Sequence, residues 1–173
     1  MTNSIDLLED GFTRIRDLVR GVADGLGPDA LGARLDPEAN TIAWLVWHLT
    51  RVQDDHVADA ASTEQVWTSG GWADRFGLPF DPDATGYGHS PAEVAQVAGP
   101  GVTAESLVGY HEAVFAATTA YLRSISSDEL ERVVDESWDP PVTLAVRLVS
   151  VISDDLQHAG QASFVRGLLE RQG

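Results

Sequence analysis

The chain has 173 residues, of which 27 are acidic and 11 are basic, so its formal net charge at pH 7 is −16. Nucleic acids and anionic membrane surfaces bind clusters of basic side chains, so this charge argues against both as partners. No run of about 18 apolar residues is present, which excludes a transmembrane helix. The chain is 43% hydrophobic and 22% charged, a balance typical of one folded domain, here residues 1–173.

The chain has no cysteine and no lysine, and all 11 basic residues are arginine. Without cysteine there is no disulfide and no cysteine nucleophile, so any thiol chemistry requires an external thiol. The absence of lysine, together with only two asparagines, indicates a GC-rich genome. The N-terminal residues MTNSIDLLEDGF lack the basic and apolar regions of a signal peptide, and we therefore expect a cytoplasmic protein.

Four segments show the apolar periodicity of long amphipathic helices: about residues 5–26, 40–61, 103–125 and 142–170. In the first segment, apolar side chains recur at alternating spacings of four and three: Leu8, Phe12, Ile15, Val19, Val22 and Leu26. Gly25, Gly27 and Pro28 are expected to end this helix. The second helix begins at an N-cap that either Asn40 or the pair Asp36 and Pro37 supplies.

A long connection, about residues 62–101, follows the second helix and is rich in glycine, proline and aromatic side chains. Such a density of aromatic residues is typical of an ordered, packed segment. Within it, residues 90–93 (SPAE) have the pattern of a capping box and predict a short helix to about Val97.

Capping signals also mark the second half of the chain. Thr103 is the expected N-cap of the third long helix, and residues 126–129 (SSDE) form a capping box that opens a short helical turn. Pro140 and Pro141 prevent helix before the last long helix begins at about Val142. Four helices of this length, with one long loop-rich connection between the second and the third, predict an all-α fold, a four-helix bundle.

Polar side chains interrupt the apolar stripe of the last helix, whose members are Val151, Asp154, His158, Gln161, Val165 and Leu168. Asp154 and His158 are four residues apart, so their side chains project together, as two ligands of one ion do. His48 lies on the inward side of the second helix. Two histidines and one carboxylate suit Zn²⁺, and also Ni²⁺ or Fe²⁺, and three protein ligands leave a coordination position open, as in catalytic sites.

Alternatives to this ligand set remain open. In one, Asp154 faces solvent and His158 makes an ordinary hydrogen bond. In another, Asp155 replaces Asp154 as the ligand, because it lies three residues before His158. His56 lies about 12 Å further along the second helix than His48, which is too far to share the ion.

Other polar residues have both a functional and a structural interpretation. His111, on the inward stripe of the third helix, is the candidate catalytic residue, as a proton carrier, and the alternative is an ordinary core histidine. Gln161 either orients a ligand or a water molecule, or makes a hydrogen bond in the core. His89 is expected to be structural. The tryptophans of the second helix and the connection are expected to pack, and the alternative is that some of them line the mouth of a pocket: Trp44, Trp47, Trp67 and Trp72.

Three parts of the chain resemble a known family: residues 40–49 (NTIAWLVWHL), residues 67–72 (WTSGGW) with 85–89 (TGYGH), and residues 154–161 (DDLQHAGQ). Over nearly its whole length the chain resembles the DinB-like superfamily, in particular the branch related to mycothiol-dependent transferases and maleylpyruvate isomerase. The resemblance implies a four-helix bundle with a three-ligand metal site at His48, Asp154 and His158. Many members have histidine where this chain has Asp154, and the mycothiol-linked branch has a carboxylate there.

The resemblance also implies a function, the transfer of an external thiol, mycothiol, to a small electrophile with the help of a divalent metal, with zinc expected first. A free thiol has a pKa near 8.5, and binding at the open metal position would favour its thiolate. A homodimer is implied as well, and the lysine-free composition fits the actinobacteria that make this thiol. Two alternatives stay open: a metal-dependent hydrolase, and a bundle that binds a metal or a ligand without catalysis.

Overall fold

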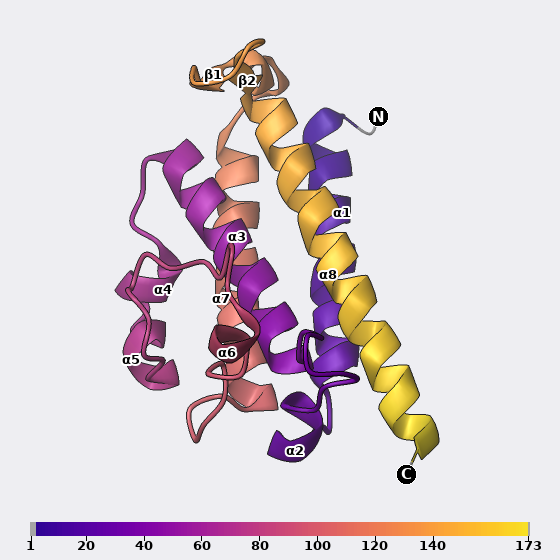
Figure 1. The fold of residues 1–173 in the computed structure, drawn as a ribbon. Coiled ribbons are helices and arrows are strands. Elements are labelled where there is room, and N and C mark those ends of the chain that lie inside the picture. Colours follow the sequence, from indigo (N-terminus) through magenta and orange to yellow (C-terminus); the bar gives the residue numbers. More distant parts are fainter. Residues whose placement is uncertain (1–2, 173) are drawn as a thin grey trace.

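The computed structural model describes residues 3–172 and consists mainly of four long helices (Figure 1). These are α1 (Ser4–Ala23), α3 (Ile42–Ala61), α7 (Ala104–Ser124) and α8 (Leu144–Gln172). Helix α1 packs against α7 and α8, and α3 packs against the same two helices. The predicted all-α four-helix bundle is therefore confirmed. Among the described residues, no helix is both long enough and apolar enough to span a membrane.

Short elements fill the connections: α2 (Pro28–Leu31), α4 (Val66–Ser69), α5 (Trp72–Phe76), α6 (Pro91–Val94), the 3-10 helix η1 (Ser127–Glu131), β1 (Val133–Asp135) and β2 (Val142–Thr143). Strands β1 and β2 pair antiparallel in a small hairpin at the end of the bundle where α8 begins (Figure 1). The apolar pattern does not predict this hairpin, because strands of two or three residues show no periodicity. The same holds for the single turns α2, α4 and α5.

Helix caps agree with the sequence at three positions, one of which is the capping box of Ser126 before η1, and differ at a fourth. Thr103 caps α7 and Ser90 caps α6, each as part of a capping box, as predicted. The N-cap of α3 is Thr41, and not Asn40 or Asp36, because the Thr41 hydroxyl accepts a hydrogen bond from the backbone N–H three residues on.

Helix α1 ends earlier than its apolar stripe. Its last residue is Ala23, whereas the stripe predicts Leu26. Asp24 already leaves the helical conformation, with φ −56° and ψ 127°, and Gly25, with a positive φ of 72°, completes a turn before Leu26. Helix α8 similarly begins at Leu144, two residues after the prediction, because Val142 belongs to the hairpin.

The buried face of α8 differs from the predicted stripe in its middle. The buried side chains of this helix are Leu144, Leu148, Val151, Asp155, Ala159, Ala162 and Val165. Asp155 therefore points into the core, whereas Asp154 and His158 lie at the edge of this face, partly buried, and Gln161 is exposed. Both sets satisfy a spacing of three and four residues, so the periodicity alone does not distinguish them.

Candidate metal centre and its cavity

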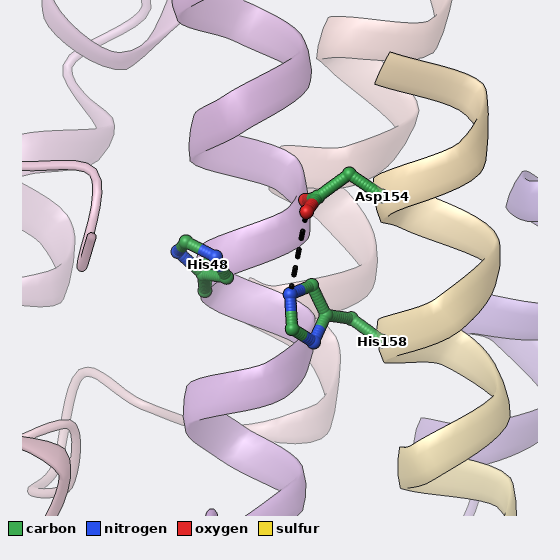
Figure 2. Close-up of side chains that lie close together, drawn as sticks. All are labelled: His48, Asp154 and His158. Atoms are coloured by element: carbon green, nitrogen blue, oxygen red, sulfur yellow. Dashed lines mark ion pairs between the residues drawn. The ribbon is translucent and has the colours of Figure 1, made fainter. Parts of the chain in front are cut away.

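The side chains of His48 on α3 and of Asp154 and His158 on α8 converge between the two helices (Figure 2). One possible ligand atom from each side chain lies within 4.8 Å of the other two. Nε2 of His158 lies 3.6 Å from Oδ1 of Asp154. We call these three residues the cluster. The structure thus brings together the three residues that the sequence predicts as metal ligands.

Each imidazole of the cluster has its Nδ1 engaged in a hydrogen bond. The backbone carbonyl of Thr85 lies 2.6 Å from Nδ1 of His48, and the amide oxygen of Gln161 lies 2.9 Å from Nδ1 of His158. Because a carbonyl oxygen only accepts, Nδ1 carries the proton in the neutral form of both rings, and Nε2 then keeps its lone pair. Metal-binding histidines typically show this arrangement, with the second ring nitrogen held by a carbonyl or carboxylate.

One carboxylate oxygen of Asp154 indicates that a cation fits the cluster. Oδ2 of Asp154 is buried and has no hydrogen-bond partner among residues 3–172. Leaving a buried carboxylate oxygen without a partner costs free energy, and a bound cation would remove that cost. Two imidazoles and one carboxylate also form the donor set of open zinc sites. The residues present therefore fit a divalent metal ion.

The electrostatics of the cluster favour ligation by His48. Burial lowers the pKa of His48, so this imidazole is neutral at neutral pH, as a metal ligand must be. Asp154 raises the pKa of its neighbour His158, and that imidazole in turn lowers the pKa of Asp154. Asp154 therefore keeps its negative charge, and His158 is the ligand with which protons compete more strongly.

A cavity of about 600 Å³ lies beside the cluster, and His48 and Asp154 form part of its wall. Its other walls come from α3, from α8, from the connection between α3 and α7, and from the hairpin: Val52, Thr85, Tyr87, Trp138, Val146 and Val151. Tyr87 and Trp138 are large aromatic side chains that are nevertheless mostly exposed. Because His48 and Asp154 line the cavity, a small molecule bound in it would contact the cluster directly.

Near the hairpin, the cavity wall carries a separate polar group. Arg147 donates a hydrogen bond of 2.8 Å to Asp135, and another of its nitrogens lies 2.8 Å from Nδ1 of His56. Burial and the positive charge of Arg147 lower the pKa of His56. Among the described residues, His56 is not part of the cluster, in agreement with the distance along α3.

His111 and Asp155 lie in the core and do not line the cavity. Nδ1 of His111 lies 3.1 Å from the Thr50 hydroxyl, its Nε2 has no partner within the described part of the chain, and burial lowers its pKa to about 3. Asp155 is fully buried, and neither of its carboxylate oxygens has a partner there. Burial raises the pKa of Asp155 well above its usual value. The structure groups Asp154, and not Asp155, with the two histidines.

The aromatic residues behave mostly as predicted. Trp44, Trp47 and Trp67 are buried in the core, and Trp72 packs against it partly exposed. His89 accepts a hydrogen bond from the indole N–H of Trp44. The ring of Trp44 also stacks on His48, with centroids 4.5 Å apart and planes 15° apart. Packing and support of the candidate ligand are thus combined in one side chain.

Sequence reasoning missed the Thr85 carbonyl, because a backbone acceptor leaves no trace in residue type. It also missed Tyr87 and Trp138 as cavity residues, since only the tertiary fold brings the connection and the hairpin together. The one available signal was the pair of glycines in residues 85–89, where the chain approaches another element closely.

Helical packing and the cluster together define a DinB-like four-helix bundle with a candidate metal centre. A family model described as Mycothiol-S-transferase matches residues 7–171, so the chain belongs to the mycothiol S-transferase family of that superfamily. Among solved structures, a conserved protein from Enterococcus faecalis is similar to the chain, with 28% sequence identity, 96% of each chain covered and a TM-score of 0.88. A search of curated proteins finds no match.

Proposed function

We propose that this protein is a metal-dependent S-transferase that joins mycothiol to a small electrophile. Membership of the mycothiol S-transferase family supports the thiol. The observation that carries the proposal is the convergence of His48, Asp154 and His158 beside a cavity that His48 and Asp154 line. A bundle with such a cluster sealed inside its core would instead suggest a structural metal.

The cluster residues would hold a divalent cation, with zinc as the first expectation and nickel or iron as alternatives. When bound, the cation supplies a Lewis acid that lowers the pKa of a thiol below its usual value near 8.5. Thr85 and Gln161 keep the protons of His48 and His158 on Nδ1, so that both Nε2 atoms remain free to bind. Asp154 contributes a full negative charge.

The cavity supports the second substrate. Valine side chains and the two exposed aromatic rings provide apolar surface for a small organic electrophile. In the reaction, the thiol loses its proton to solvent and sulfur bonds to carbon, while the electron pair of the broken bond leaves with the departing group or stays on an opened ring, which takes up a proton. His111 has no part in this proposal, because it does not line the cavity and is protonated only near pH 3. The homodimer and the cytoplasmic location stay predictions.

The test follows the consumption of chlorodinitrobenzene by the purified protein with and without mycothiol, before and after removal of metal by a chelator. We expect consumption that needs both mycothiol and metal, returns when zinc is added back, and is absent in His48→Ala. Metal-dependent cleavage of a nitrophenyl ester without any thiol would instead identify a hydrolase. A protein that binds metal tightly but is inactive in both assays would identify a non-catalytic bundle.

A further inference from the structure

One stripe of α3 contacts the segment 82–89 along its length. Trp44, His48 and Arg51 are spaced by four and then three residues, so their side chains share this stripe. Arg51 donates to two carbonyls at the start of the segment, His48 to one in the middle, and Trp44 to an imidazole at the end: Pro82, Ala84, Thr85 and His89. The candidate ligand His48 thus lies between two other anchors of the same segment.

Gly86 is the residue that allows this segment to approach His48 so closely. Its φ is +92°, and a Cβ atom built there would lie 2.9 Å from the Trp47 ring and 3.0 Å from Nδ1 of His48. Because non-bonded atoms of this size prefer about 3.5–4.0 Å, a side chain at this position would push the segment away from the imidazole. Gly88 has a similar φ of +74°, but a Cβ there meets nothing within 4 Å in the described structure.

Arg51 holds the same segment from the buried side. Its side chain is completely buried, Nε donates to the carbonyl of Ala84, and Nη2 donates to that of Pro82, both at 3.1 Å. Nη1 donates to the partly buried Gln65 and to the buried Tyr110, and the Asp54 carboxylate lies 3.7 Å away. A planar guanidinium bound through all three nitrogens has a single orientation. The carbonyl of Thr85, one residue after Ala84, is therefore held in one place.

We infer that Arg51 and Gly86 are positioning residues of the candidate metal centre. They fix the Thr85 carbonyl against His48, so that the proton stays on Nδ1 and Nε2 is presented to the cluster. Which nitrogen of a histidine binds a metal is set by the hydrogen bond that the other nitrogen makes. Without this carbonyl, part of the His48 population carries the proton on Nε2 and does not bind. The inference rests on the proposed metal site.

The matched variants Gly86→Ala and Gly88→Ala test it, because both place alanine at a positive φ and only the first meets His48. Zn²⁺ affinity is measured by competition with a chromogenic chelator. We expect Gly86→Ala to weaken Zn²⁺ binding about 10- to 100-fold, the usual effect of losing a partner of a metal-binding histidine. Gly88→Ala should stay within about threefold of wild type. Equal affinities of the two variants would overturn the inference.

The protonated nitrogen of His48 provides a second readout, measured in the metal-free protein by long-range proton–nitrogen NMR. We expect the proton on Nδ1 in wild type and in Gly88→Ala, and a mixture of both forms in Gly86→Ala. Any other pattern contradicts the positioning role. If wild type binds no Zn²⁺, the proposed function fails, while this readout still decides whether the segment controls the imidazole.

Arg51→Lys tests the anchor itself. It keeps a positive charge beside Asp54, but the ammonium lacks the planar fork that reaches both carbonyls. We expect Zn²⁺ affinity to fall about tenfold while circular dichroism still shows a folded helical protein. Unchanged affinity in a folded Arg51→Lys would remove Arg51 from the inference. This variant also replaces the test at Gly86 if Gly86→Ala does not fold.

Discussion

Two buried histidines, His48 and His111, lie in different regions of the same bundle. Both lie on inward faces of long helices, both have Nδ1 against an oxygen atom, and burial lowers the pKa of both. His48 faces a carboxylate and a second imidazole beside a cavity, whereas Nε2 of His111 has no partner among the described residues. Burial therefore does not identify a site. Converging donors and access from a cavity do.

The adjacent residues Asp154 and Asp155 repeat the comparison for carboxylates. Asp154 lies beside an imidazole that lowers its pKa, so it stays charged and ready to bind a cation. Asp155 is fully buried, and burial raises its pKa. One step along α8 thus separates a carboxylate suited to metal binding from an acid of the core.

The largest expected effect is on metal content, which should distinguish the histidines of the cluster from His111. We expect about one equivalent of divalent metal in the wild-type protein and almost none in His48→Ala or His158→Ala, since a lost ligand costs more than the roughly 10- to 100-fold of a lost ligand partner. His111→Gln should keep the wild-type metal content. Elemental analysis of the purified proteins measures this. Wild-type content in both alanine variants would show that the cluster is not the metal site.

The matched variants Asp154→Asn and Asp155→Asn separate the two carboxylates. We expect Asp154→Asn to weaken Zn²⁺ binding at least about tenfold and Asp155→Asn to leave it unchanged. Because the folded pKa of Asp155 is raised, its contribution to stability is present below about pH 3.8 and is lost as the pH rises toward the folded pKa. Asp155→Asn should therefore gain stability relative to wild type as the pH rises, in urea denaturation. If Asp155→Asn weakened Zn²⁺ binding and Asp154→Asn did not, Asp155 would be the metal ligand and Asp154 would not.

The low pKa of His111 predicts a pH-dependent stability. Below pH 6.5 the unfolded chain binds a proton that the native state does not bind until about pH 3, so stability falls as the pH drops through this range. At pH 5 the loss is about 2 kcal/mol, from about 1.36 kcal/mol per pKa unit. His111→Gln removes this titration, and urea denaturation at neutral pH and at pH 5 measures the difference. An equal loss in both proteins would show that the pKa of His111 is not lowered in the folded state.

The smallest effect is expected at Gln161, whose oxygen accepts from Nδ1 of His158. Gln161→Leu should weaken Zn²⁺ binding by up to about tenfold, because the side chain is exposed and water replaces it in part. Gln157→Leu is the control, since Gln157 is also exposed on α8 and, within residues 3–172, its side chain hydrogen-bonds to Ser153 alone. Similar Zn²⁺ affinities of these two variants would show that the hydrogen bond of Gln161 does not help His158 to bind the metal.

The fold was predictable where the pattern is long and repetitive. Each of the four long helices shows several turns of periodic apolar residues, and local capping residues such as Ser90 and Thr103 mark where helices begin. The hairpin that forms part of the cavity wall has strands of two and three residues, which are too short to show a periodic pattern. Thr41 caps α3, although the adjacent Asn40 is an equally good capping residue by type. Which of the two is the cap depends on the backbone conformation at each position, and residue type does not reveal it.

Of the candidate site, the sequence by itself determined the ligand types and their spacing. A pair four residues apart projects from one helix face whatever the rest of the fold does, and His48 stands out on an apolar helix. Only the tertiary structure decided which of Asp154 and Asp155 faces His48, because this depends on the rotation of α8 against α3 by less than half a turn. It also decided the role of Thr85, since a backbone carbonyl becomes a partner only where the fold places it.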